Sequence, residues 1–175
     1  MGADKGLVPP INFLRWIEDN RHKLKPPLMN EVVYKDTEFI IMVVGGPNTR
    51  SDYHIDPAEE FFYQLEGDMV LKVMQGGEPV DVRIEEGEIF LLPALVPHSP
   101  QRFADTVGLV IERRRGDDEL DALAWYCGDC NAQLYQETFH LQDITRDLPP
   151  VFDRFYGSQA HRTCGACGFV MPERP

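Results

Sequence analysis

The sequence is poor in basic residues and cysteine, and it has no long apolar run. Its 175 residues include 17 Lys and Arg against 29 Asp and Glu, so the formal net charge is −12. A field of that sign repels polyphosphate, and we therefore expect neither nucleic acid nor an anionic membrane surface as a partner. The longest apolar run, residues 39–44, is far too short to span a membrane. The polar N-terminus lacks the apolar core of a secretory signal, which favours a soluble, cytoplasmic protein.

Short apolar segments separated by turn residues dominate the first two thirds of the chain. Turn signals such as Gly45-Gly46-Pro47, Gly67, Gly76-Gly77 and Gly87 separate them. Closely spaced short strands without long helices between them are typical of an antiparallel sandwich or barrel, so we expect a mainly β protein. The strands are expected at residues 31–34, 39–44, 61–66, 69–74, 79–84, 88–92 and 108–113.

Helical patterns flank this region. Asn12 is placed to cap a short N-terminal helix whose apolar face carries Phe13, Trp16 and Ile17. Residues 116–125 are expected to form a charged connector or short helix. After an expected strand at residues 134–141, a helix is predicted to open at Pro149-Pro150 and to stop at Gly157.

All four cysteines lie in the last third of the chain, in two C-x-x-C pairs: Cys127 with Cys130, and Cys164 with Cys167. In a reducing compartment four thiolates favour a tetrahedral Zn or Fe site over disulfides, and the absence of an open position points to a structural role. Two redox dithiols or free cysteines are the alternative. We expect residues 1–115 to form the barrel domain with its N-terminal helix, and residues 116–175 to form a small four-cysteine metal module packed on it.

Two of the five histidines stand in motifs. In the first motif, His54 is followed by Glu60 and then Gly67. The second runs from Gly87 through Pro93 to His98. These spacings resemble the two motifs of the cupin superfamily, which are jelly-roll barrels that hold a metal at the centre.

Two family positions differ in this chain. Asp56 replaces a second histidine, and Leu95 replaces a glycine. We interpret Asp56 as a non-ligand because Pro57 places it in a turn.

Two imidazoles and one carboxylate make the facial triad of non-haem Fe(II) oxygenases, which leaves open positions on the metal. His54, Glu60 and His98 are the predicted ligands. Glu59 competes with Glu60, but neighbouring strand residues face opposite sides and Glu60 keeps the motif spacing. The three remaining histidines lack such a context and are expected at the surface: His22, His140 and His161.

Charged residues flank the predicted metal ligands. Arg50 precedes His54 by four residues, Arg102 follows His98 by four, and Glu112 lies in an otherwise apolar strand. Because arginine binds carboxylates in a bidentate manner, this set suggests a small substrate that carries both a carboxylate and an amine. The alternative is that these are ordinary surface charges.

The chain resembles the 3-hydroxyanthranilate 3,4-dioxygenase family over nearly its whole length. The resemblance rests on residues 13–17, 24–27, 43–48, 52–54, 59–65, 89–93, 97–102, 109–113 and 125–127. It implies a jelly-roll enzyme that uses Fe(II) and O₂ to open an aromatic ring with adjacent carboxylate, amine and hydroxyl groups. The product would be 2-amino-3-carboxymuconate semialdehyde, the precursor of quinolinate and NAD.

The resemblance also implies roles for single residues. Arg102 would hold the substrate carboxylate, Glu112 would contact the amine or take a proton, and Arg50 would stabilise charge on oxygen. Glu60 would border the substrate as well as the metal. The four cysteines would form a rubredoxin-like second iron site, which could also hold Zn, and the protein would be a homodimer.

Two rival classes stay open at this point. A cupin isomerase or epimerase would use the metal as a Lewis acid and would not need O₂. A metal-binding cupin without activity would sense a small ligand or dock a partner through its cysteine module.

Overall fold

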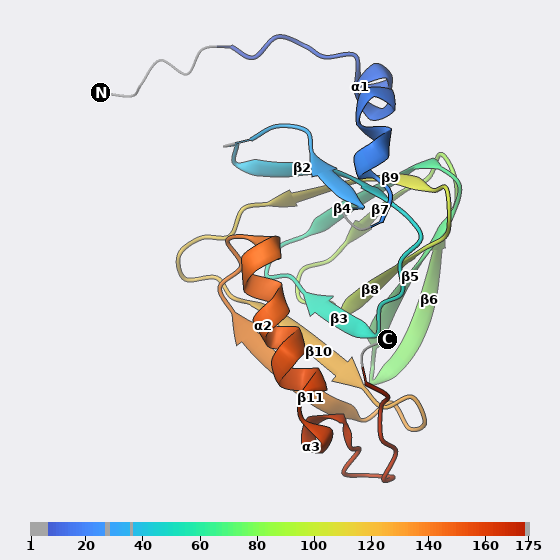
Figure 1. Ribbon diagram of the computed structural model, residues 1–175, viewed down its shortest axis with the longest axis vertical. Helices are drawn as coiled ribbons and strands as arrows, with labels where there is room; N and C mark the ends of the chain where they lie inside the picture. The colour runs from blue at the N-terminus through green and yellow to red at the C-terminus, as the bar shows by residue number, and fades with distance from the viewer. Residues whose placement is uncertain (1–6, 27–28, 36, 174–175) are drawn as a thin grey trace.

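The computed structural model describes residues 7–26, 29–35 and 37–173. The polar N-terminal residues 1–6, and Pro27 in one of the family-like segments, lie outside the described residues. Two antiparallel sheets face each other and enclose a barrel, with one helix at each end of the molecule (Figure 1). The predicted mainly β fold with short flanking helices is confirmed.

The first sheet has five strands, and its two edges are β1 and β7. In spatial order the strands are β1 (Asn30–Val32), β2 (Phe39–Gly45), β9 (Val107–Arg113), β4 (Glu60–Glu66) and β7 (Ile89–Leu92). Along β4, buried and less buried residues alternate, as the two-residue period of a strand requires. The inner face of β4 therefore carries Glu60, Phe62 and Gln64.

The second sheet has six strands and carries the C-terminal part of the chain at one edge. Its spatial order is β11 (Gln133–Phe139), β10 (Asp121–Tyr126), β3 (Asp52–Ile55), β8 (His98–Arg102), β5 (Met69–Gln75) and β6 (Glu78–Ile84). The β5–β6 hairpin closes through Gly76 and Gly77, which both have positive φ, as a tight two-residue hairpin turn requires.

The core lies between the two sheets, and both contribute to it. The first sheet supplies Met42, Phe62, Leu92 and Val110, and the second supplies Met69, Leu71, Val73 and Ile84. Each of these side chains is at most 9% exposed. Burial of apolar surface on this scale is the main stabilising contribution in a barrel of this size.

Helices cover part of the outer surface of each sheet. Helix α1 (Phe13–Asn20) begins at Asn12, whose side chain accepts a hydrogen bond from the backbone N–H of Arg15, so the predicted cap is confirmed. A short 3₁₀ turn, η1 (Arg21–Lys23), continues it. Ile17 of α1 packs against Val43 and Val107 on the outside of the first sheet.

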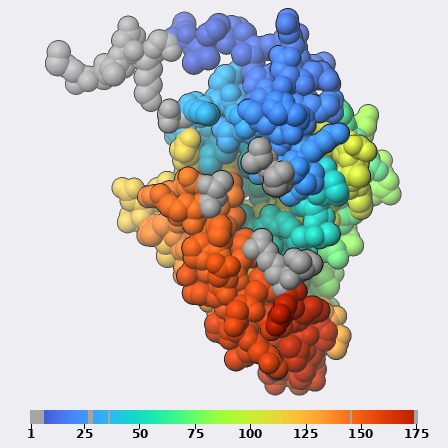
Figure 2. Space-filling model, in the orientation of Figure 1, coloured from blue at the N-terminus to red at the C-terminus, as the bar shows by residue number. Residues whose placement is uncertain are grey.

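Helix α2 (Ile144–Tyr156) packs against β10 and β11. Phe155 stacks on Trp125 with ring centroids 4.1 Å apart, and both residues are fully buried. A short helix, α3 (Gln159–Arg162), leads to the C-terminal residues. On the face shown in Figure 2, the C-terminal residues form one end of the molecule and α1 lies at the other. Among the described residues, no helix is long and apolar enough to cross a membrane.

The predicted start of the last long helix was wrong. It begins at Ile144 rather than at Pro149, so both prolines lie inside it. The prediction placed the start there because a residue before proline is disfavoured in the helical region, and because a proline gives no backbone N–H to the helix. The Asp147 carboxylate accepts backbone N–H groups of Gln142 and Asp143 and stabilises the earlier start. Its predicted end at Gly157 is confirmed, since the Gly157 N–H closes the last turn on Asp153.

The expectation for residues 116–125 was wrong in its second half. Residues 121–126 form β10, a central strand that is buried on both faces, so its sequence shows no alternation. Strands β3 and β8 were not predicted at all, because their polar inner side chains mask the strand pattern. The second sheet therefore continues past residue 115, where the sequence predicts the boundary between barrel and cysteine module.

Candidate metal centre and substrate cavity

Two histidines lie directly opposite each other on neighbouring strands inside the barrel. His54 on β3 is the cross-strand partner of His98 on β8, and their ring centroids are 5.2 Å apart. His98 is 1% exposed. The register of these two strands therefore brings together residues that are 44 positions apart in the chain.

Glu60 reaches the same point from the other sheet. Ligand atoms of His54, Glu60 and His98 all lie within 4.8 Å of one another. Glu60 Oε2 lies 2.7 Å from His98 Nε2, and the carboxylate is buried. Glu59 is exposed and outside this group, as expected from the alternation of a strand.

The chemistry of this contact fits a bound cation. Nδ1 of His98 lies 3.0 Å from the carbonyl of Val96, so a ring that donates there presents a lone pair at Nε2. That lone pair would face Glu60 Oε2, a buried oxygen without a hydrogen-bond donor among the described residues. Two lone pairs 2.7 Å apart repel each other unless a proton or a metal cation lies beside them. Two imidazoles with one carboxylate suit a divalent transition metal.

Without a metal, the ionisation of these groups favours a proton on His98 Nε2, between the ring and the Glu60 carboxylate. Burial opposes the charge on Glu60, but His98, His54 and Arg115 outweigh it and lower the pKa of Glu60. Burial likewise opposes a charge on His98, yet the Glu60 carboxylate raises the pKa of His98. The pair is thus held together by charge, and Glu60 is the anionic member.

Asp56 lies outside the ligand group, as the sequence predicted. One of its carboxylate oxygens accepts the backbone N–H of Ala58, and the other lies 2.7 Å from Arg115 Nη2. Burial raises the pKa of Asp56 to about 8, although Arg115 opposes this shift. The substitution of the second family histidine therefore leaves three protein ligands in the cluster.

A cavity of about 150 Å³ adjoins the cluster and is lined by two of its members, His54 and Glu60. Its polar lining residues include Asn48, Arg50, Arg102 and Glu112 beside His54 and Glu60. Its apolar lining residues come from both sheets and from the region of α2: Met42, Val44, Phe62, Val110, Leu123, Leu141, Ile144 and Leu148. An apolar cavity with a few convergent polar groups is the usual form of a small-molecule site.

Arg102 lines this cavity, and its positive charge has no carboxylate partner among the described residues. It is 3% exposed, and Nη1 donates to Gln64 Oε1 at 3.1 Å, which links the two sheets. No carboxylate among the described residues forms an ion pair with it. Burial lowers the pKa of Arg102 to about 10, despite the nearby Glu60. A buried guanidinium with free donors is suited to bind a carboxylate.

Gly108 makes room for this arginine. A Cβ at Gly108 would lie 2.5 Å from Arg102 Nη1 and 2.4 Å from Gln64 Oε1, so any other residue would displace these two side-chain ends. Gln64 and Gly108 are cross-strand partners, so the register of β4 and β9 defines the space. Sequence reasoning missed both residues, since neither belongs to a motif that carries charge.

Arg50 and Glu112 both line the cavity, but they pair with different partners. Arg50 is paired with the buried Asp52 carboxylate, two positions along the chain. Glu112 lies directly opposite Glu60 on the neighbouring strand, and its Oε2 accepts a hydrogen bond from Arg115 Nη1 at 2.9 Å. The structure therefore brings Arg50, Arg102 and Glu112 to one cavity with His54 and Glu60. His98, the third metal-ligand candidate, contacts Glu60.

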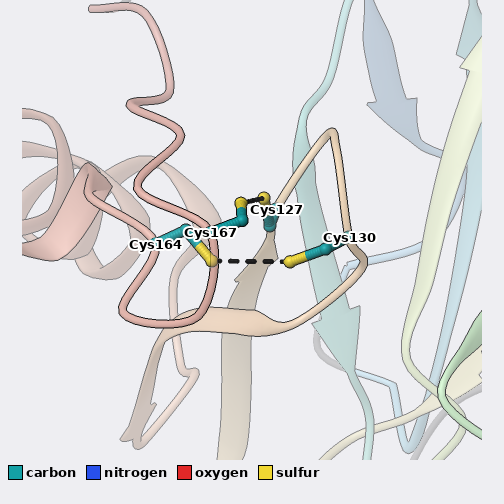
Figure 3. A group of neighbouring side chains, drawn as sticks. All are labelled: Cys127, Cys130, Cys164 and Cys167. Carbon is teal, nitrogen blue, oxygen red and sulfur yellow. Dashed lines mark hydrogen bonds between the residues drawn. The ribbon is translucent and has the colours of Figure 1, made fainter.

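The four cysteines form a second cluster, in which the side chains of both C-x-x-C pairs point toward one another (Figure 3). Sγ of Cys127 lies 3.5 Å from Sγ of Cys167, and the same distance separates Cys130 from Cys164. A disulfide would require about 2.05 Å, whereas four sulfurs about 2.3 Å from one tetrahedral metal lie about 3.8 Å apart. The closest partners thus lie across the two C-x-x-C pairs and not within them.

The two C-x-x-C pairs share one backbone conformation. The N–H of Cys127 donates to Ala132 and its carbonyl accepts from Asn131; Cys164 makes the same bonds with Phe169 and Gly168. Asn131 and Gly168 both have positive φ. Backbone N–H groups of Cys167 and Ala166 lower the pKa of the Cys164 thiol to about 6, which favours the thiolate that binds metal.

The other histidines lie outside both clusters. His22 and His140 are exposed, and His161 stacks on Tyr135 with centroids 4.3 Å apart. None of them lies in a metal-ligand group of the described residues.

Comparison with known proteins shows which family this chain is similar to. A family model described as 3-hydroxyanthranilic acid dioxygenase matches residues 6–156. A protein of Xanthomonas euvesicatoria pv. vesicatoria named 3-hydroxyanthranilate 3,4-dioxygenase is 58% identical over 166 residues, covering 95% of this chain and 94% of its own length. A protein of the same name from Jannaschia sp. is 55% identical over 163 residues, covering 93% and 91%.

Solved structures are more distant. A cupin-2 domain protein from Shewanella frigidimarina is 18% identical, with a TM-score of 0.48 over 59% of this chain and 94% of that one.

Adjacent glutamates provide a matched test of the metal centre. We predict that Glu60→Gln weakens Co²⁺ or Fe²⁺ binding in the barrel by more than about 100-fold, because it removes the anionic ligand rather than an outer partner. Glu59→Gln, an exposed neighbour, should leave the affinity unchanged. Titration of the metal-free protein with a competing chelator measures both. Retention of the metal by folded Glu60→Gln would contradict the ligand assignment.

Proposed function

The chain belongs to the 3-hydroxyanthranilic acid dioxygenase family, and we propose on that premise that it converts 3-hydroxyanthranilate and O₂ to 2-amino-3-carboxymuconate semialdehyde. Both oxygen atoms enter the product as the ring opens beside the hydroxylated carbon. One observation carries the proposal: a cluster of two histidines and one carboxylate adjoins the same small cavity as a buried arginine that has no ion-pair partner among the described residues.

In this proposal Fe(II) is held by His54, Glu60 and His98. Iron bound there supplies open positions for the substrate hydroxyl and amine and for O₂. His54 and Glu60 line the same cavity as Arg102 and Glu112, so a substrate that bound the metal would also meet these two side chains. The protein thus orients the ring before the reaction begins.

Arg102 is the proposed carboxylate-binding residue. Its position on β8, four residues after His98, puts the guanidinium on the same inner face as the metal ligand. Because Arg102 is buried and lacks a carboxylate partner, a substrate carboxylate would complete an ion pair in a water-poor site.

Glu112 is the proposed contact of the substrate amine or acceptor of a proton. It lies opposite Glu60, so both carboxylates border the same part of the cavity. Arg50 is the proposed stabiliser of negative charge that develops on oxygen, and its pairing with Asp52 holds it at the wall. The apolar lining residues of the cavity, such as Leu123 and Leu148, would exclude water from the ring.

We assign a structural role to the four-cysteine cluster, with Fe or Zn as its metal. Four thiolates leave no open coordination position for a substrate. Thiolate ligands persist where thiols are kept reduced, and we therefore propose a cytoplasmic setting. The product would serve quinolinate and NAD synthesis.

We further propose that two copies of the chain pair through the outer face of the five-stranded sheet. An apolar row crosses this face in register: Ile41, Ile111, Phe61 and Leu91. Helix α1 covers a neighbouring part of the face at Val43 and Leu109. A sheet face open to water is usually polar, so an apolar row ending at the edge strand β7 fits a second copy.

The proposed reaction can be tested directly. Protein loaded with Fe(II) without oxygen is mixed with 3-hydroxyanthranilate and then with O₂. We expect a ring-opened chromophore and one O₂ consumed per substrate. Conversion without O₂ consumption would contradict the proposal in favour of an isomerase, and binding without conversion would favour a ligand sensor.

Arg102→Ala should mainly weaken substrate binding. Removing a hydrogen bond to a charged group costs about 1.5–3 kcal/mol, so KM should rise about 10- to 150-fold. Arg83→Ala is the matched control, because Arg83 lies on the surface in a pair with Asp68. Steady-state kinetics of the ring-opening reaction measures both variants. An unchanged KM for Arg102→Ala would rule out the carboxylate-binding role.

The proposed dimer surface can be tested with one substitution. Leu91 is 53% exposed on β7, and Leu91→Glu would bury a charge if a second copy covers it. We expect sedimentation velocity to show a dimer for the parent protein and a monomer for this variant. Val80→Glu, at a 39% exposed position on the other sheet, should remain dimeric. A monomeric parent protein, or a dimeric Leu91→Glu variant, would contradict the assignment.

A further inference from the structure

A buried arginine beside the cavity has no part in the proposed reaction. Arg115 lies just beyond the end of β9, and its side chain is 4% exposed. Its guanidinium contacts three carboxylates: Nη2 lies 2.7 Å from Asp56 Oδ2 and 2.6 Å from Asp121 Oδ1, and Nη1 lies 2.9 Å from Glu112 Oε2. One rigid, planar group thus joins β9, β10 and the turn after β3.

Asp121 connects this arginine to a metal-ligand candidate. It is the first residue of β10 and is fully buried. Its Oδ1 lies 2.7 Å from His54 Nε2, while Arg115 donates to both of its carboxylate oxygens through Nε. Arg115 therefore holds the carboxylate in place, and the carboxylate faces the imidazole.

The two imidazoles of the cluster are held through opposite nitrogens. His98 uses Nδ1 for a backbone carbonyl, which leaves Nε2 for a metal. If His54 donates from Nε2 to Asp121, its lone pair at Nδ1 is left for the metal. A carboxylate behind a ligand histidine fixes the ring orientation and makes the ligand more basic.

We propose that Asp121 and Arg115 are positioning residues that align the metal centre with the substrate wall. Asp121 orients His54, and Arg115 holds both Asp121 and the substrate-facing Glu112. One guanidinium thereby sets the position of a metal ligand and of a substrate contact together. The inference rests on the proposed function only in taking His54 as a ligand and Glu112 as a substrate contact.

The test measures metal affinity without substrate. Metal-free protein is titrated with Co²⁺ against a chelator, and thiolate charge-transfer bands distinguish the cysteine cluster from the barrel centre. We expect Asp121→Ala to bind Co²⁺ in the barrel about 10- to 100-fold more weakly. Asp121→Asn should lose less, because its amide oxygen can still accept the His54 N–H. Glu119→Gln, which breaks the neighbouring surface pair with Arg113, is the control and should bind normally.

Arg115→Lys supplies an independent test if Asp121→Ala fails to fold. Lysine keeps the charge but cannot bridge three carboxylates with a planar fork. We expect weaker Co²⁺ binding, and a higher KM with little change in kcat, because Glu112 loses its partner. Folded variants with unchanged Co²⁺ affinity would overturn the proposal. Tighter binding in Asp121→Ala would also overturn it, because Asp121 would then compete with the metal for His54. A failure of ring opening alone would leave these affinities unaffected and would count only against the proposed reaction.

Discussion

The pairing of β3 with β10 is the constraint on which the metal centre depends. Strand β3 pairs with β10 along its whole length, but within the described residues it meets β8 in register only at His54 and His98. The position of His54 is therefore determined mainly by the pairing of β3 with β10. That strand begins at Asp121, which faces His54, and leads directly into Cys127 of the second cluster. Strand β10 thus pairs with the strand that carries His54 and leads into the cysteine cluster.

The buried arginines of the barrel differ in whether a carboxylate of the protein pairs with them. This difference distinguishes arginines that hold other side chains in place from one that is suited to bind a ligand. Arg115 faces three carboxylates, and Arg50 is paired with Asp52. Arg102 has the neutral Gln64 as its partner and forms no ion pair among the described residues. Since a buried charge without a counterion is costly, a site that keeps one gains by binding an anion. In a protein with a net charge of −12, that local mismatch would supply the attraction for an anionic substrate in the proposed reaction.

Much of the candidate site could be predicted from the sequence, because it depends on local patterns. The spacing of His54, Glu60 and His98 follows family motifs, and strand alternation separates Glu60 from Glu59. Asp121 and Arg115 could not be predicted in this way. Asp121 closes an acidic run that begins at Asp117 and looks like a solvated connector. Only the register of β10 with β3 brings it to His54, and register across distant segments is not encoded in local periodicity.

The two clusters differ chemically, although β10 connects the neighbourhood of His54 with Cys127. The barrel centre offers nitrogen and oxygen donors from three strands, in a cavity with room for a substrate. The cysteine cluster offers four sulfurs from two C-x-x-C pairs that share one backbone geometry. Borderline metals such as Fe(II) accept both donor sets, so selection rests on geometry: a closed tetrahedron at one site and open positions at the other. Because β10 leads from Asp121 into Cys127, a metal that closes the cysteine cluster also restrains the end of the strand that positions His54.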